Sequence, residues 1–256
     1  SAGGLSNYNV LNVGKIENKG VEVNLNIVPV KTENTTWDVN FNFSKFKPIV
    51  TSFSDNVDDS YMISTGGISG GVGNNIQAFA KDQVLSSFYV YQQAYDTNGK
   101  AIDGVYVDRN NDGIINSSDK YFFHSPNPDA IFGFSTKVTT RKWEFSTALR
   151  AVIGNYVYNN AAANSSLADI TSSSYNYLRN QEKSVLTNQF SGFEYFSDLF
   201  IEDASFLRMD NLSVGYNFGD FLGNKKSNLR VTAMAQNVFV ITKYTGVDPE
   251  VFGNID

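Results

Sequence analysis

Residues 20–28 read GVEVNLNIV, and in this stretch apolar and polar side chains alternate at almost every position. The apolar members are Val21, Val23, Leu25 and Ile27, and the polar members are Glu22, Asn24 and Asn26. A period of two is that of a β-strand, because successive side chains point to opposite faces. The stretch therefore predicts a strand with one apolar and one polar face.

The same alternation returns along the chain and predicts further strands. In residues 36–44 the apolar side chains are mostly aromatic, and the polar ones are again rich in asparagine. Two later strands flank the short turn Thr139-Thr140-Arg141-Lys142 and read as a hairpin. The predicted strands cover residues 20–28, 36–44, 131–139, 142–153, 205–218 and 228–241. We therefore expect an all-β protein with antiparallel strands.

The connections between these strands alternate between short turns and two very long excursions, residues 45–130 and 154–204. Loops of this length are uncommon in compact soluble domains. Outer-membrane β-barrels have short periplasmic turns and long extracellular loops, on strands of about 9–11 residues. The pattern favours a transmembrane β-barrel segment with extracellular excursions. A soluble sandwich with one wet face gives the same alternation and is the alternative.

The composition excludes several classes of protein. Charged residues make up 18% of the chain and the net charge is −6, so no basic face is available to bind nucleic acid. Cysteine is absent, which leaves no disulfide framework and no thiolate chemistry. No stretch approaches the roughly 18 consecutive apolar residues of a membrane helix. A helical membrane protein is therefore excluded, whereas a barrel is not.

The first excursion contains two contrasting segments. Asn98-Gly99 stands between two strand-like runs and is a strong signal for a β-hairpin. Residues 64–75 read STGGISGGVGNN, which offers few side chains for a core, so we expect this stretch to be mobile or ordered by a ligand. The excursion is thus predicted to combine an ordered hairpin with a loose glycine-rich segment.

Residues 108–119 read DRNNDGIINSSD and have the spacing of an EF-hand calcium loop. Oxygen-bearing side chains converge on one side of such a loop, a glycine permits the sharp turn, and one backbone carbonyl completes the set. We expect Ile115 to anchor the loop to apolar neighbours. Oxygen ligands alone favour Ca²⁺. The predicted ligands are Asp108, Asn110, Asp112, the carbonyl of Ile114, Asn116 and Asp119.

A calcium-sensor role is not expected for this loop. Its last position is Asp119, where helix-loop-helix sensors have glutamate, and neither flank reads as a helix. The alternative is a polar Asp-Gly turn that holds no metal.

Other residues offer little catalytic chemistry. His124 is the only histidine, so a histidine-based triad or metal site must involve it, and we expect a polar loop residue instead. Asp198, Glu202 and Asp203 could pair as the carboxylates of a glycosidase, but a solvated loop face is the simpler expectation. The sequence therefore predicts that the chain is not an enzyme.

Four segments carry a resemblance to a known family. They are NVGKIENKGVEVNLNI at residues 12–27, GVYVDRNNDGIINSSDKYFFHSPNPDAIFGFSTKVTTRKWEFSTALRAVIGNYVYN at 104–159, FIEDASFLRMDNLSVGYNF at 200–218 and LRVTAMAQNVFVITKYTGVDPEV at 229–251. Each piece alone is a weak signal, and their order in combination is specific. Together they resemble the C-terminal barrel portion of SusC-like TonB-dependent outer-membrane transporters.

The resemblance implies a 22-stranded barrel with an N-terminal plug. It further implies an importer of glycans or peptides in the cell outer membrane, powered through the TonB complex and paired with a SusD-like surface lipoprotein. Outer-membrane lipid would contact the apolar faces. This chain lacks the plug, the TonB box and the final strand of that pattern, so we expect a fragment. The alternative is a soluble calcium-stabilised β-domain that binds carbohydrate.

Overall fold

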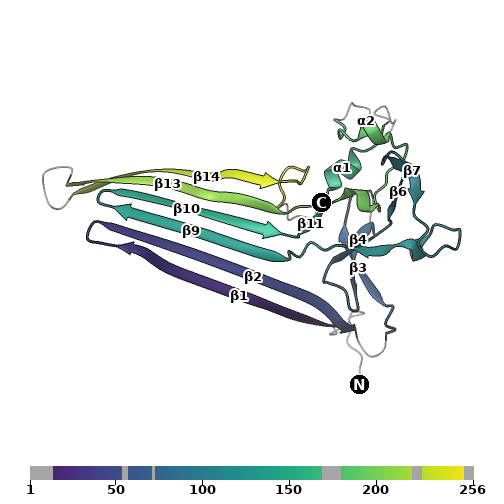
Figure 1. Ribbon diagram of the computed structural model, residues 1–256. Coiled ribbons are helices and arrows are strands. Elements are labelled where there is room, and N and C mark those ends of the chain that lie inside the picture. The colour runs from purple at the N-terminus through teal and green to yellow at the C-terminus, as the bar shows by residue number, and fades with distance from the viewer. Residues whose placement is uncertain (1–13, 54–56, 71–72, 169–179, 221–226, 251–256) are drawn as a thin grey trace, which may run out of the picture.

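The computed structural model describes residues in five stretches and divides into two regions (Figure 1). The described residues are 14–53, 57–70, 73–168, 180–220 and 227–250. A long antiparallel sheet extends to one side, and a compact region of short strands and helices stands at one end of it. We call the compact region, built from described residues of 57–129 and 154–204, the loop domain. No helix in the described stretches is long and apolar enough to cross a membrane.

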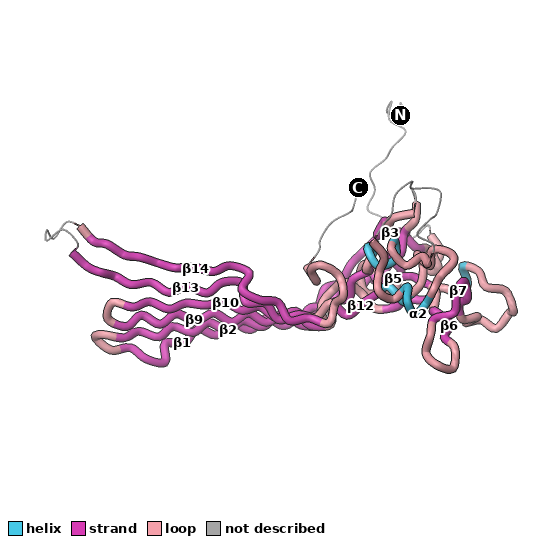
Figure 2. The backbone as a smooth tube through the Cα atoms, turned by 90° about the horizontal axis from the view of Figure 1, so that it is seen from above, coloured by secondary structure: helices cyan, strands magenta, loops and turns pink. Residues whose placement is uncertain are grey.

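The long sheet has the strand order β1-β2-β9-β10-β13-β14, and each strand is antiparallel to its neighbours. The strands are β1 Gly14–Lys31, β2 Thr35–Phe53, β9 Ala130–Thr140, β10 Trp143–Ile153, β13 Phe206–Asp220 and β14 Asn228–Thr242. Figure 2 shows these strands as a single layer that meets the loop domain only at one end. Most of this sheet therefore has no second layer of described residues to pack against.

Residues 45–53, expected to begin the first excursion, belong to β2 instead. Here β1 is the partner strand of β2, because the pairing with β9 ends at Ser44 and Ile131; on that side an isolated bridge joins Ile49 to Val84. Pro48 lacks a backbone N–H and is tolerated where one side of a strand has no partner strand. Its carbonyl accepts the N–H of Leu85 at 2.9 Å. The extension therefore carries β2 beyond the alternating stretch and into contact with the loop domain.

One face of the long sheet is apolar. Residues directly opposite each other on neighbouring strands share a face, and one such row runs from Leu25 through Phe41 and Phe134 to Leu149. The register also places on this face Val21, Val23, Ile27, Trp37, Phe43, Phe132, Val138, Trp143, Phe145, Leu212 and Val214. Many of these side chains are exposed in the chain alone. The result is an apolar surface that spans the whole sheet.

The opposite face is polar and mostly uncharged near its middle. The Asn40 amide donates to the side chain of Asn26 and, at 3.4 Å, to that of Asn24. Farther across the sheet the hydroxyls of Ser146 and Ser213 lie 2.7 Å apart. Such neutral side chains can hydrogen-bond to water or to a polar ligand without a fixed charge.

One cluster of charged groups on the polar face is paired internally. Glu144 on β10 lies 3.0 Å from the Lys137 ammonium of β9 and also binds Arg230 of β14. Because these side chains are partly exposed, each pair contributes little to stability, on the order of 0–1 kcal/mol. With one carboxylate and two cations, the cluster leaves one net positive charge on this part of the face.

The loop domain is made of short elements. Its strands are β3 Met62–Gly67, β4 Asn75–Ala80, β5 Ser87–Val90, β6 Gln93–Tyr95, β7 Ala101–Tyr106, β8 Tyr121–Phe123, β11 Tyr156–Tyr158 and β12 Ile201–Asp203. Its helices are α1 Asn160–Asn164 and α2 Val185–Asn188, with single 3₁₀ turns η1 Ser117–Asp119 and η2 Asp198–Phe200. The strands pair as β3-β4-β5-β8, β6-β7 and β11-β12. These pairings stay within one excursion each, and the two excursions meet in shared apolar clusters.

Both apolar core clusters lie in the loop domain. The first contains Ala101, Ala162, Ala163, Phe190 and Phe200, and the second contains Ile76, Phe88, Val90 and Ile201. Among the described residues of the long sheet, the buried apolar side chains are Pro48, Val50 and Phe206, at the end near the loop domain. The two regions thus differ in how they bury apolar surface.

The hairpin predicted at Asn98-Gly99 is confirmed. Strands β6 and β7 pair on either side of it, and the Gly99 N–H donates to the Asp96 carbonyl at 3.0 Å. Gly99 has φ of +77°, a conformation that glycine adopts without strain.

The expectation of a loose segment at residues 64–75 is wrong for the described part of that stretch. Residues through Gly67 form β3 and pair with β4, and Ile68 packs against the second core cluster. Gly66 has φ of +70°, and an added Cβ would meet the side chain of Gln77. The glycine is needed here for backbone conformation and close approach, which composition alone does not distinguish from flexibility.

Candidate functional site

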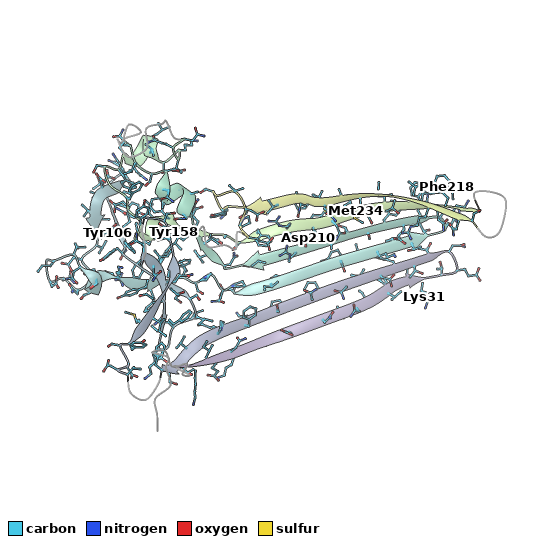
Figure 3. The ribbon with its side chains drawn as sticks, turned by 180° about the vertical axis from the view of Figure 1, so that it is seen from behind. Lys31, Tyr106, Tyr158, Asp210, Phe218 and Met234 are labelled. Carbon is cyan, nitrogen blue, oxygen red and sulfur yellow. The ribbon has the colours of Figure 1, made fainter. Side chains whose placement is uncertain are left out.

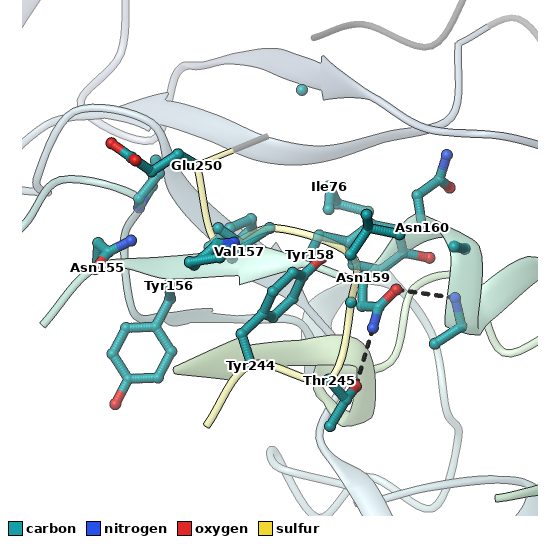
Figure 4. Close-up of a pocket in the computed structure, with 18 of the residues that line it drawn as sticks. Ile76, Asn155, Tyr156, Val157, Tyr158, Asn159, Asn160, Tyr244, Thr245 and Glu250 are labelled. Carbon is teal, nitrogen blue, oxygen red and sulfur yellow. Dashed lines mark hydrogen bonds between the residues drawn. The ribbon is translucent and has the colours of Figure 1, made fainter. Parts of the chain in front are cut away.

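A cavity of about 1240 Å³ lies where the long sheet meets the loop domain. Its walls come from β4, β10, β11, helix α1 and the segment that follows β14. Figure 4 shows β11 and that segment lying across the cavity. Common small-molecule pockets measure roughly 300–1,000 Å³, so this cavity has room for a larger, oligomeric ligand.

Amide side chains are the most numerous polar groups in the lining. They are Gln77, Asn127, Asn155, Asn159, Asn160, Asn180 and Gln181. Asn159 is fixed on three sides. It donates to Glu202 at 2.9 Å, its oxygen accepts the Ala162 N–H, and it donates to Thr245 at 3.1 Å; Figure 4 shows the bond to Thr245. It therefore ties the helix, the loop domain and the segment after β14 together.

Asn155 presents an unsatisfied acceptor in the same lining. The residue is only 7% exposed, and its Oδ1 has no hydrogen-bond partner among the described residues. A buried acceptor without a donor costs roughly 1–3 kcal/mol, which a water molecule or a ligand hydroxyl would relieve. The position suits a hydrogen-bond donor.

Two arginines stand side by side on the polar face next to the cavity. Arg150 on β10 is directly opposite Arg208 on β13. Arg150 Nη2 lies 3.1 Å from Asp210 Oδ1 and 3.1 Å from Glu250 Oε2. Arg208 Nη2 lies 2.6 Å from Asp248 Oδ1, and Arg208 Nε lies 2.9 Å from Glu250 Oε2. These five side chains form one network, which we call the arginine network.

The arginine network joins two stretches that are distant in the sequence. Asp210 lies on β13 toward the loop domain (Figure 3), whereas Asp248 and Glu250 follow the end of β14. The Arg208 guanidinium lowers the pKa of Asp248, with help from a backbone N–H, so this carboxylate stays ionised. Charge-assisted bonds of this kind are stronger than neutral ones.

Aromatic side chains give the cavity one of its walls. Tyr156 stacks on His124, with ring centroids 3.7 Å apart and planes 3° apart. The Tyr158 hydroxyl donates to the carbonyl of Tyr195 at 2.9 Å, and burial raises the pKa of Tyr158. His124, a loop residue as expected, is therefore held by stacking, and partial burial of the stacked ring lowers its pKa.

In the predicted calcium loop, Asp119 is a fully buried carboxylate. Its Oδ1 accepts the N–H of Arg109 at 2.9 Å and that of Asn110 at 3.4 Å, and its Oδ2 accepts the N–H of Asn116 at 2.9 Å. The bond from Asn116 is the largest of several that lower the pKa of Asp119, although burial opposes them. The side chain therefore closes the loop on itself.

Asp108 and Asp112 also accept from the loop backbone. Asp108 binds the N–H groups of Asn111 at 2.7 Å and Gly113 at 2.8 Å, and Asp112 binds that of Ile114 at 2.8 Å. Gly113 has φ of +80°, which fits the sharp turn predicted at this position. The loop thus takes the turn expected of its spacing.

The asparagine side chains of the loop also form hydrogen bonds within the loop. The Asn110 amide donates to Asp112 at 2.9 Å, the Asn116 oxygen accepts the N–H of Ser118, and the Asn116 amide contacts the Ile114 carbonyl at 3.2 Å. Within the described stretches, no three acidic, histidine or cysteine side chains gather closely enough to hold a metal ion. The ligand types suit Ca²⁺, but their oxygens are arranged around backbone N–H groups.

One detail of the loop prediction is wrong. Ile115, expected to anchor the loop to apolar neighbours, is 43% exposed. Asp119 instead holds the loop together from within, because its buried carboxylate binds three backbone N–H groups of the same loop.

Comparison with known proteins identifies the family. The chain is 39% identical to the TonB-dependent receptor SusC of Bacteroides thetaiotaomicron over 253 residues, which cover 96% of this chain and 25% of SusC. The chain belongs to the SusC family of TonB-dependent receptors. The TonB-dependent receptor P3 of Formosa agariphila is 26% identical over 264 residues, covering 94% of this chain and 26% of that receptor. No protein-family model matches the chain.

Solved structures agree with the SusC-family fold. The RagAB peptide transporter matches with a TM-score of 0.73 at 20% identity, over 93% of this chain and 27% of that chain. The RagAB peptide importer in its closed-closed state matches with a TM-score of 0.73 at 22% identity, over 94% of this chain and 28% of that chain. The long sheet is therefore a segment of a transmembrane β-barrel in the outer membrane.

This chain spans about a quarter of the length of the relatives it matches. Those relatives are receptors and transporters by description, not enzymes. A soluble sandwich would need a second sheet over the apolar face, and no described strand provides one. The family and barrel segment predicted from the sequence are confirmed.

The carboxylates considered for catalysis in this SusC-family chain do not pair with one another. Asp198 accepts the Gln93 N–H at 2.9 Å and the Tyr121 hydroxyl at 2.7 Å. Glu202 accepts from Asn159 and from Thr245 in the segment after β14, and Asp203 from its own turn. They connect parts of the loop domain, so the expectation of a purely solvated face is wrong for Asp198 and Glu202.

The arginine network was missed by the sequence analysis. Arg208 and Asp210 stand in the quoted segment FLRMDN, and Asp248 and Glu250 stand in TGVDPE, but neither segment points to the other. The one available signal is a charged side chain on a strand whose polar face is mostly neutral. In the strand WEFSTALRAVI, Arg150 is such a side chain, and Glu144 is the other charge.

Proposed function

We propose that the full-length protein imports glycans or peptides across the outer membrane with energy transmitted by the TonB complex. This chain forms the C-terminal part of its barrel. The observation that carries the proposal is the 39% identity to SusC over 96% of the chain. RagAB, described as a peptide importer, shares the fold.

The two faces of the long sheet support transport. An apolar outer face suits lipid, and a polar inner face suits a water-filled passage. The amide-rich cavity at the end of this face can form many neutral hydrogen bonds with a polar oligomer. The acidic groups weighed for catalysis are engaged in holding the loop domain together. We therefore assign binding and passage to this chain, and no catalysis.

Uptake by living cells tests this function. A strain without the full-length gene should lose uptake of fluorescent glycans or of fluorescent peptides, and the class lost identifies the substrate. The intact gene should restore uptake, and the same gene without its TonB-contacting segment should not. Unchanged uptake of both classes in the deletion strain would overturn the proposal.

A SusD-like surface lipoprotein is the proposed partner. The loop domain gathers both excursions at one end of the sheet and so offers a surface outside the membrane. Contact with the TonB complex is assigned to the part of the protein outside this chain. Affinity purification of the tagged full-length protein should recover the lipoprotein in near-equal amount, and recovery of the receptor alone would contradict the assignment.

We also propose that the loop at residues 108–119 binds Ca²⁺ through Asp108, Asn110, Asp112, the Ile114 carbonyl, Asn116 and Asp119. The oxygen chemistry and the positive φ of Gly113 support it. Binding requires the carboxylate oxygens to turn from backbone N–H groups toward the ion. Its effect would be local, because the loop lies far from the strands of the long sheet.

Calcium binding is tested with Asp112→Ala, which removes one charge and one ligand. We expect weaker binding by calorimetry and faster protease cleavage near Asn116, with a chelator giving the same increase in the parent protein. If neither the substitution nor the chelator changes calcium content or cleavage, the loop is a polar turn without metal.

A further inference from the structure

The segment that follows β14, residues 243–250, folds back across the polar face, and we call it the strap. It leaves β14 at the sheet edge and reaches Arg150 on β10, two strands away. No residue of the strap belongs to a helix or strand. Its course across the sheet therefore depends on side-chain contacts.

The strap is fastened at two places. Near its start, the Thr245 N–H and hydroxyl each donate to Glu202 at 2.8 Å, and Thr245 also accepts from Asn159. At its end, Asp248 and Glu250 complete the arginine network. One fastening holds the strap to the loop domain and the other holds it to the long sheet.

Between Thr245 and Asp248 the strap has little to hold it. Gly246 and Val247 are the residues there, and Val247 is 99% exposed, whereas Pro249, next to the second fastening, is buried. Segments with few buried apolar contacts and no backbone pairing have low local stability. The strap can therefore detach without unfolding the sheet beneath it.

The fastening to the sheet is incomplete. Arg208 Nε is buried and lies 2.9 Å from Glu250 Oε2, yet its N–H has no well-aligned hydrogen bond. Hydrogen bonds weaken steeply with poor alignment. In addition, two arginines face three carboxylates, so the network carries one uncompensated negative charge. These features favour a contact that holds the strap and can also release it.

The strap also forms part of the cavity wall. Six of its residues line the cavity, and so do Arg150 and Val152 of the sheet that it crosses. Figure 4 shows the strap, with Tyr244, Thr245 and Glu250, passing beside Val157 and Tyr158 of β11. We propose that the strap is a latch: the arginine network holds it across the cavity, and its release opens the cavity toward the polar face. The transport consequence of this opening rests on the proposed function.

The test uses the full-length protein in outer-membrane vesicles, in a background without other accessible cysteines. Val157→Cys places a thiol in the cavity wall, and its reaction rate with a bulky maleimide reports how open the cavity is. Asp248→Asn with Glu250→Gln removes both strap charges and keeps side-chain shape. We expect labelling about tenfold faster, equivalent to about 1.4 kcal/mol of lost fastening. Each single substitution should give an intermediate rate.

Glu144→Gln is the matched control, because it removes ion pairs to Lys137 and Arg230 on the same face without touching the strap. Its labelling rate should stay within about twofold of the parent rate. A spin label at Val247→Cys gives a second readout and should become more mobile in the double variant. An unchanged labelling rate and mobility in the double variant, or equal acceleration in the control, would overturn the latch.

Labelling does not require transport, so the latch and the proposed function fail separately. If the receptor imports nothing but the double variant is labelled faster, the proposed function is wrong and the latch is supported. If uptake is normal but the labelling rate of the double variant is unchanged, the latch is wrong and the proposed function stands.

Discussion

The long sheet and the loop domain are built from one chain but bury apolar surface in opposite ways. In the loop domain apolar side chains meet in two clusters, and Phe190 is fully buried. In the sheet they line up on one face, and Val21, Val23 and Leu25 remain about half exposed. A soluble protein rarely leaves so large a continuous apolar surface open to water.

The difference identifies the solvent of each region. The loop domain buries its apolar side chains in its own two clusters and can stand in water. The sheet satisfies its backbone by pairing but needs an external apolar medium for one face, which the lipid of the outer membrane provides. The alternation that begins at residue 20 therefore reflects two environments, with lipid on one face of the strand and water on the other.

The largest expected effect comes from removing a core side chain of the loop domain. Phe190→Ala should destabilise that domain by about 3–5 kcal/mol, because a large side chain is lost from a fully packed site. Protease should then digest the loop domain while the barrel band persists on gels. Leu186→Ala, at a side chain that is 80% exposed, is the control and should change stability by about 0.5 kcal/mol or less. Equal sensitivity of the two variants would contradict the assigned core.

A charge on the apolar face tests the other half of the comparison. Phe134→Arg should destabilise the full-length barrel by about 2–4 kcal/mol if that face meets lipid near the middle of the membrane. Ser135→Arg, the next residue on the opposite face, should cost less than about 1 kcal/mol. Urea unfolding in lipid vesicles measures both. Similar losses for the two variants would mean that the faces are wrongly assigned.

A smaller effect is expected at Asp119, which holds the loop at residues 108–119. Asp119→Asn replaces an accepting oxygen by a donor that faces backbone N–H groups, so cleavage near Asn116 should rise about tenfold with a chelator present. Asp59→Asn, at an exposed carboxylate of the loop domain, should leave the rate unchanged.

The same carboxylate gives a pH dependence. Because the folded pKa of Asp119 is lowered, its stabilising contribution is present above the ordinary value of 3.8 and is lost as pH falls through the lowered pKa. Protection of the loop from cleavage by an acid-active protease should therefore be constant from pH 7 to about pH 4. Loss of protection near neutral pH would contradict this role.

The smallest effect is expected on the polar face. Glu144→Gln removes two partly exposed ion pairs and should change barrel stability by less than about 1 kcal/mol. A loss comparable to that of Phe134→Arg would show that the polar face is packed rather than open to water.

The sheet could be predicted because its side chains obey a single rule. In residues 20–28 and 36–44 the alternation is uninterrupted enough to fix the two faces, and the structural register agrees. The extension of β2 through Pro48 could not be predicted, since it depends on which side of the strand lacks a partner. Residues 169–179, and residues 12 and 13 of the first family-like segment, lie outside the described residues.

The loop domain and the cavity could not be predicted in the same way. Its strands are too short to show a period, and Gly66 is explained only by the proximity of Gln77. The arginine network joins Arg150 to Glu250 across 100 positions of sequence. The Asn98-Gly99 hairpin could be predicted because the turn depends on neighbouring residues in the sequence alone.

Labelling of two adjacent positions tests the central claim most directly. Asn24→Cys and Leu25→Cys differ by one residue of β1, so a strand with one lipid face and one wet face must present them to different solvents. In the full-length protein in outer-membrane vesicles, a membrane-impermeant thiol reagent should modify position 24 and spare position 25. Modification of position 25 with protection of position 24 would contradict the assignment of the faces.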